Sequence, residues 1–135
     1  MNDEQTGPTK NDSWEVGVRQ TVAAPLHVVW DFLLGAGLGL WLGSTTLTLE
    51  KGAGYRTTEG VTGEIRSVTE RQKLKLTWHP DDWPHDTTLQ VTVKEVADGT
   101  TIGFRHEQLA DRDERHMMVG HWKNVVAELA KAIEG

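Results

Sequence analysis

The segment FRHEQLADRDERHMMVGHW, residues 104 to 122, holds the side chains best suited to chemistry. It contains His106, His116 and His121 among several acids. A zinc site on one helix favours two histidines at positions i and i+4. Here the spacings are ten and five, and His116 and His121 diverge by about 140° around a helix of 3.6 residues per turn. The spacing therefore argues against a metal site, and we expect no metal and no other cofactor.

His106 is the strongest candidate for an acid or base, because it shares the inward face of a predicted strand with Ile102 and Phe104. Two interpretations are open. The imidazole is either hydrogen-bonded to backbone or water near the strand end, or it lines a cavity and acts there with Glu107 or Tyr55. The sequence has no cysteine and no G-x-S-x-G motif, so nucleophilic catalysis lacks support. Glycine-rich nucleotide-binding motifs are also lacking.

The composition narrows the classes of partner. A net charge of -6 argues against general nucleic-acid binding and against anionic membranes. The absence of cysteine fits a reducing compartment, and the polar start MNDEQTGPTKNDS does not read as a secretory signal. No apolar stretch is long enough to span a bilayer. We therefore expect a cytoplasmic protein that inserts into no membrane.

The chain length suits one domain, which we place at residues 13–135 after a disordered tail at residues 1–12. The alternation in SWEVGVRQTV (13–22) predicts a half-buried strand. A helix is expected from Pro25, with Gly35 as its C-cap. The glycine-rich segment AGLGLWLG that follows fits either a short helix or a turn.

Alternating and turn-forming residues then predict a meander of antiparallel strands. The segment HPDDWPHD (79–86) reads as a loop, and Asp98-Gly99 as a hairpin turn. The expected strands are 44–50, 55–60 leading into 61–70, 71–78, 87–97 and 100–109.

The last segment predicts the longest helix. Asp111 is a natural N-cap, and Glu114 stands three residues later, which resembles a capping box. The helix carries a broad apolar face, formed by Met118, Val119, Trp122, Val125, Val126, Leu129 and Ile133. A helix of this kind needs an apolar surface to cover, and the inward face of the sheet supplies one. The fold class is therefore α+β.

These motifs, taken in order, resemble the activator of Hsp90 ATPase family within the START-like (SRPBCC) superfamily. VAAPLHVVWDFLL resembles its opening strand-to-helix segment, and EGVTGEIRSVTERQKLKLTW resembles its central hairpin. DGTTIGFRHEQLAD followed by GHWKNVVAELAKAI resembles its terminal strand and helix. The resemblance covers about residues 13 to 134. It implies a helix-grip fold, in which a curved antiparallel sheet grips a long C-terminal helix around a cavity.

The resemblance implies no particular reaction, because the superfamily includes carriers, receptors and cyclases without a shared catalytic motif. The residues and the implied cavity together suggest a set of wall positions. Trp83 lies in a loop and Trp41 stands near the end of the glycine-rich segment, so both are expected near a rim. The candidate cavity residues are Trp41, Tyr55, Trp78, Trp83, His106, Met118, His121 and Trp122.

The favoured function is a non-catalytic module that binds a small apolar or amphipathic molecule between sheet and helix. One alternative is a cyclase-like or hydrolase-like enzyme with His106 as acid or base. Another is a protein-interaction module of the co-chaperone or stress type, such as a homodimer that uses Trp83 and its loop. Core packing of the tryptophans and methionines also remains open.

Overall fold

A computed structural model describes residues 14–135. The tail expected at residues 1–12, and the first residue of the expected domain, lie outside the described residues.

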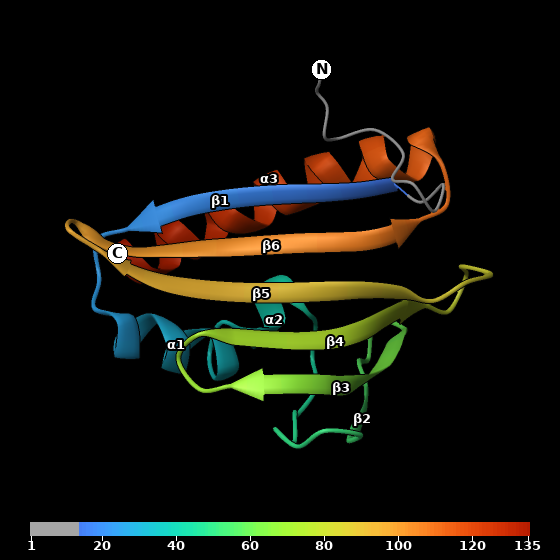
Figure 1. Cartoon of the computed structure of the whole chain (residues 1–135), viewed down its shortest axis with the longest axis horizontal. Helices are drawn as coiled ribbons and strands as arrows, with labels where there is room; N and C mark the ends of the chain where they lie inside the picture. Colours follow the sequence, from blue (N-terminus) through green and yellow to red (C-terminus); the bar gives the residue numbers. More distant parts are fainter. Residues whose placement is uncertain (1–13) are drawn as a thin grey trace.

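Six antiparallel strands form one curved sheet in the order β1-β6-β5-β4-β3-β2 (Figure 1). Strands β2 to β6 lie side by side in the order in which they follow one another along the chain. Strand β1 lies at the edge beside β6, so the first strand pairs with the last. The bounds are β1 Trp14–Val22, β2 Gly54–Arg56, β3 Val61–Thr69, β4 Lys73–Pro80, β5 Thr87–Val96 and β6 Gly99–Leu109.

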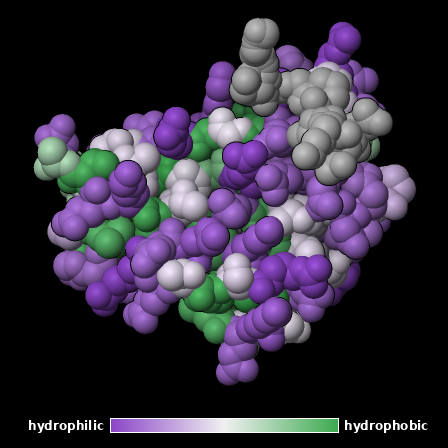
Figure 2. All heavy atoms as spheres, viewed as in Figure 1, coloured by the Kyte–Doolittle hydropathy of each residue, from purple (hydrophilic) through white to green (hydrophobic). Residues whose placement is uncertain are grey.

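The three helices lie behind the sheet in the view of Figure 1, with α3 running behind β1. They are α1 Leu26–Leu34, α2 Leu38–Trp41 and α3 Arg112–Glu134. The outer face of the sheet, which points toward the viewer, is mostly hydrophilic with small separate apolar patches (Figure 2). This is the α+β helix-grip arrangement expected from the sequence. Within the described part of the chain, no helix is long and apolar enough to cross a membrane.

The alternation of the central strands decides which side chains reach the interior. In β4 the side chains of Leu74, Leu76 and Trp78 are buried, and their neighbours in the sequence are more exposed. The same period of two buries Thr87 in β5 and His106 in β6. These inward positions face the helices and build the site.

The start of α3 is capped as the sequence predicts. The Asp111 carboxylate accepts a hydrogen bond from the backbone N–H of Glu114 at 2.8 Å. The Glu114 carboxylate in turn accepts from the backbone N–H of Ala110 at 2.9 Å. This reciprocal pairing satisfies two backbone donors and fixes where α3 begins.

Glycine is required at position 63, where β2 and β3 meet. Tyr55 lies directly opposite Gly63, and its hydroxyl donates to the backbone carbonyl of Thr77 at 2.7 Å. A Cβ atom at position 63 would overlap that carbonyl oxygen and lie 2.8 Å from the Tyr55 ring. The missing side chain therefore makes room for the buried tyrosine.

The strand predicted at residues 44–50 is wrong. This segment is irregular, and its Leu49 is 40% exposed. The alternation of threonine and leucine favours a strand only when a neighbouring strand offers hydrogen bonds. Here the adjacent sheet edge is β2, which has only three residues, and the segment is joined near it by single bonds, from the Thr58 N–H to the Ser44 carbonyl and from the Thr45 hydroxyl to the Arg56 carbonyl.

Several boundaries also differ from the prediction, and the strand expected at 55–60 ends at Arg56. Strand β4 continues through Pro80, so the loop predicted at 79–86 begins at Asp81. The hairpin turn predicted at Asp98-Gly99 lies one residue earlier, because Gly99 already pairs with Val96 in the ladder of β5 and β6.

Candidate functional site

Four aromatic rings from separate elements meet between the sheet and α3. Trp78 comes from β4, His106 from β6, Trp122 from α3 and Trp83 from the loop after β4. The ring centroids of Trp78 and His106 are 4.8 Å apart, with the planes nearly perpendicular. Trp122 lies 5.8 Å from His106 and also meets it edge to face. We call these four residues the ring cluster.

His106 is fully buried, and both of its ring nitrogens are hydrogen-bonded. The indole N–H of Trp122 donates to His106 Nδ1 at 3.0 Å. On the other side, His106 Nε2 lies 2.8 Å from the hydroxyl oxygen of Thr87, which itself donates to the backbone carbonyl of Trp78 at 2.5 Å. Because that hydroxyl proton is already used, the imidazole must donate through Nε2.

The hydrogen bonds therefore assign a neutral imidazole with its proton on Nε2. The pKa of His106 falls from 6.5 to about 3, mainly because of desolvation by burial, with smaller contributions from the nearby His121 and His85. In this arrangement, His106 would have to break one hydrogen bond before it could exchange a proton with a substrate.

The indole N–H of Trp78 is in the opposite situation. Trp78 is 7% exposed, and its Nε1 is the one buried side-chain nitrogen or oxygen in residues 14–135 that has no hydrogen-bond partner. Leaving a buried donor unsatisfied typically costs about 1–3 kcal/mol. Such an atom calls for an explanation, because native interiors pair nearly all their polar groups.

Trp83 is the partly buried member of the ring cluster. Its ring lies parallel to that of His106 within 3°, at a centroid distance of 6.4 Å. It also meets Trp78 edge to face at 5.4 Å. The sequence suggested an exposed tryptophan at the rim, and the structure places it against the interior.

Two histidines flank Trp83 and hold its loop in place. His79 Nδ1 lies 2.7 Å from the Asp86 carboxylate, and Nε2 lies 2.7 Å from the backbone carbonyl of Trp83. His85 Nε2 lies 2.9 Å from the Glu114 carboxylate of α3, and Nδ1 lies 3.1 Å from the carbonyl of Asp86. Each imidazole thus faces two acceptors, which only the doubly protonated form can satisfy with two donors.

The pKa values of His79, at the end of β4, and of His85, in the loop, are shifted in the same direction. The hydrogen bond to Asp86 is the main reason that the pKa of His79 is raised above 6.5. Burial alone would lower the pKa of His85, but its hydrogen bonds to Glu114 and to the Asp86 carbonyl outweigh that effect and raise it. The loop is therefore held by groups that lose their charge as the pH rises.

The other candidate residues are arranged around the cluster. Trp41 is buried, donates its indole N–H to the Leu33 carbonyl at 2.8 Å and contacts Phe104, so it lies inside and not at a rim. Met118 is buried on α3. His121 is exposed, and its ring meets the edge of Trp122 at 4.6 Å.

Tyr55 is placed apart from the ring contacts, on β2, where burial raises its pKa and its hydroxyl is bonded to Thr77. His116, which the sequence left outside the site, is exposed. Within residues 14–135, no group of three or more histidine, aspartate or glutamate side chains is arranged to hold a metal ion.

The sequence missed four contributors to this site. Thr87 could have been found by extending the alternation of β5 backward by one inward position. Phe104, which stacks on Trp122 at 4.9 Å, was visible as inward but not as a site residue. His79 and His85 bracket Trp83 in the sequence. The partners of His79 are local, but the Glu114 partner of His85 only becomes apparent once α3 is placed.

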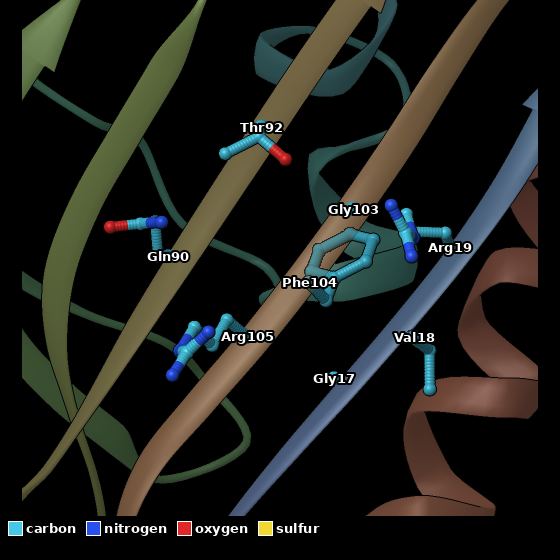
Figure 3. A pocket seen from close by; sticks show the side chains of 8 residues that line it. All are labelled: Gly17, Val18, Arg19, Gln90, Thr92, Gly103, Phe104 and Arg105. Atoms are coloured by element: carbon cyan, nitrogen blue, oxygen red, sulfur yellow. The ribbon is translucent and has the colours of Figure 1, made fainter. Parts of the chain in front are cut away.

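Three surface hollows lie outside the ring cluster. One, of about 380 Å³, is on the outer face of β1, β6 and β5, where Figure 3 shows Arg19 and Arg105 beside it. The other two are at the ends of β4 and β5 and beside β3. None of the three is lined by a member of the ring cluster. The first is lined by Gly17, Val18, Arg19, Gln90, Thr92, Gly103, Phe104 and Arg105.

Comparison with known proteins identifies the family. Residues 23–134 match the family described as activator of Hsp90 ATPase homolog 1-like protein. A comparison with curated protein sequences gave no match.

Solved structures share the fold at low sequence identity. The crystal structure of CalU16 from Micromonospora echinospora is 19% identical, with a TM-score of 0.79 over 90% of this chain and 77% of that one. The Aha1 dimer from Colwellia psychrerythraea is 16% identical, with a TM-score of 0.74 over 89% and 96%.

DynU16, from the dynemicin biosynthetic locus, is 23% identical, with a TM-score of 0.78 over 89% of this chain. The present chain spans about half, 47%, of that longer protein. These structures support the architecture, and the family match spans most of the sequence. The chain therefore belongs to the activator of Hsp90 ATPase homolog 1-like family.

Proposed function

We propose that this protein is a non-catalytic module that binds a small apolar or amphipathic molecule between the sheet and α3. The observation that carries the proposal is the convergence of large rings from β4, β6, α3 and the connecting loop on one interior region. Aromatic walls with a few placed polar groups are typical of small-molecule sites. The absence of cysteine from the sequence favours the cytoplasm as the proposed location.

The acid/base alternative has less physical support. Both nitrogens of His106 are engaged, and the ring carries no exposed surface. A general acid or base must reach the proton that it transfers. Burial also lowers the pKa of the imidazole to about 3, and this value is far from the range that suits a general acid or base near neutral pH.

Self-association is a separate proposal, because one structural relative is described as a dimer. It would use the loop that carries Trp83. A constant monomer mass in light scattering at high protein concentration would contradict it and leave the binding proposal unaffected.

The binding proposal is tested by native mass spectrometry of the protein purified from its own host, followed by denaturing extraction. We expect a small molecule that stays bound under native conditions and is released on denaturation. Recovery of empty protein from several growth conditions, together with no binding of apolar probes, would contradict the proposal.

Two adjacent methionines provide a matched comparison. Met118 is buried on α3, whereas Met117 is 52% exposed. If Met118 contacts the ligand, Met118→Ala lowers occupancy by a larger factor than its loss of stability explains, and Met117→Ala changes neither. Equal occupancy in both folded variants would show that Met118 belongs only to the core.

A further inference from the structure

The unbonded indole N–H of Trp78 marks a missing acceptor inside the ring cluster. Among the polar side chains that the strands and α3 bring to the cluster, the others are saturated, since His106, Thr87 and Trp122 bond to one another or to backbone. A molecule entering the cluster would therefore find one free group, and that group is a donor.

The Trp83 ring lies 5.4 Å from the Trp78 ring, edge to face, and Trp83 is held differently from the other three members of the cluster. Trp78, His106 and Trp122 belong to strands or a helix, whereas Trp83 lies in the loop between β4 and β5. The base of this loop is fixed, because the Asp81 N–H donates to the Gly60 carbonyl and Asp81 pairs with Arg56.

Beyond that base, the loop is attached mainly through side chains. His79 holds the Trp83 carbonyl, and His85 reaches across to Glu114 on α3. The Trp83 N–H closes a turn by donating to the Pro80 carbonyl, but this stretch of backbone belongs to no strand ladder. Outward movement of Trp83 therefore requires these few contacts to break, while the sheet stays intact.

We propose that Trp83 is a displaceable plug that occupies the ligand's place, and that the ligand is a flat, uncharged aromatic molecule whose oxygen or nitrogen acceptor takes the N–H of Trp78. This inference rests on the proposed binding function and specifies its ligand.

The shape of the ligand follows from the ring that it replaces. Trp83 lies parallel to His106 and edge-on to Trp78, so a flat ring in its place keeps both contacts. The absence of charge follows from the rings that a ligand in this place would contact, because Trp78, Trp122 and the neutral His106 carry none. Burying an unpaired charge there would be costly.

His79 and His85, which hold the loop, make displacement of Trp83 depend on pH. The groups that face them are Asp81 and Asp86 in the loop, Glu114 on α3, Arg56 on β2 through its pair with Asp81, and the neutral His106 on β6. The two histidines also face each other, and the charge of His79 lowers the pKa of His85 without reversing its rise. Protonated histidines hold the plug, and this contribution is present below about pH 6.5 and is lost as the pH rises through their raised pKa values. Ligand binding should therefore strengthen at higher pH.

The test uses prodan, a neutral fluorescent naphthalene ketone, and 2-(dimethylamino)naphthalene, which has the same ring system without the ketone. Trp83→Ala removes the plug and should bind prodan about tenfold more tightly than the unmodified protein. Trp78→Phe keeps a ring but removes the donor, so prodan affinity should fall about fivefold while affinity for the ketone-free compound stays the same.

Trp122→Phe serves as the comparison for loss of a bonded indole N–H. The affinity of unmodified protein for prodan should also rise severalfold between about pH 6 and about pH 8.5, and this rise should vanish in Trp83→Ala. Circular dichroism checks that each variant folds. If Trp83→Ala does not fold, His85→Gln weakens the contact with Glu114 that holds the loop and leaves the Trp83 ring in the protein.

The outcomes separate the two proposals. Equal prodan affinity in unmodified protein and Trp83→Ala would overturn the plug. An equal effect of Trp78→Phe on both compounds would overturn the donor assignment. Failure of folded Trp83→Ala to bind either naphthalene, while it still binds a fatty-acid probe, would overturn the aromatic ligand alone. Binding of no probe by any variant would overturn the proposed function itself.

Discussion

His106 and Trp78 lie side by side and illustrate two fates of a buried polar side chain. The imidazole has a partner for each nitrogen, whereas the indole N–H has none. The first arrangement stabilises the interior, because a satisfied network offsets the loss of water. The indole N–H of Trp78 stays without an acceptor, and a bound molecule that carries one would satisfy it.

The neutral state of His106 predicts the acid sensitivity of the protein. Its pKa is about 3 in the folded state and 6.5 in its ordinary environment, so the unfolded chain binds more protons between these values. Stability should therefore fall as the pH drops from about 6.5 toward 3, by up to about 1.4 kcal/mol per pH unit from this one group.

Urea unfolding at about pH 7 and about pH 4.5 measures this effect in unmodified protein and in His106→Gln. The variant should be less stable at neutral pH, because it disrupts the bonds to Thr87 and Trp122. It lacks the titrating group, so the difference in unfolding free energy should narrow in acid. A difference that stays constant with pH would contradict the assignment.

At the scale of elements, the hairpin of β2 and β3 requires glycine at position 63. Helix α3 also contains a glycine, Gly120, but nothing in its surroundings requires one. Gly63 leaves room for the Tyr55 ring and the Thr77 carbonyl. Gly120 lies within α3, and a Cβ atom there would meet nothing within 4 Å.

These two positions make opposite predictions for the same substitution. Gly63→Ala should destabilise the protein by about 2 kcal/mol or more, because backbone must move. Gly120→Ala should stabilise it by about 0.5–1 kcal/mol, because alanine favours helix over glycine. Chemical unfolding of both variants measures the change, and a stable, unshifted Gly63→Ala would show that the hairpin can open without cost.

At the scale of the whole molecule, one core links elements that are distant in sequence. Trp30 of α1, Trp41 of α2, Trp78 of β4 and Trp122 of α3 all belong to it. Strand β1 also pairs with β6, which brings residue 14 opposite residue 109. No element can lose its packing without exposing the others.

This shared core predicts cooperative unfolding. The tryptophans are spread along the chain, so their fluorescence reports on many elements at once, whereas far-UV circular dichroism reports on the backbone. Urea transitions followed by the two signals should have the same midpoint. A loss of tryptophan packing at lower urea than the loss of secondary structure would indicate that the core melts separately.

The sequence by itself determined the main elements of this protein. A period of two in β4, β5 and β6, and a period of about 3.6 in α3, are local properties, and each states which side chains must be buried. The Asp111 cap was equally local, since its donor lies three residues away. The α+β class follows because the helix stripe and the inward strand faces each need a partner.

The tertiary structure decided everything that depends on a partner distant in the chain. The alternation at residues 44–50 is a valid strand pattern, yet this segment forms no ladder with β2, the three-residue strand at that edge of the sheet. Two interpretations of His106 fitted its position, and the hydrogen bonds with Thr87 and Trp122 show which groups hold it. Trp83 looked like a loop residue at a rim, and only packing against Trp78 and His106 brought it inside. The spacing of residues along a strand or helix determines which way a side chain points. Whether its donor has an acceptor depends on distances between the sheet and the helix, which are set only when the two pack together.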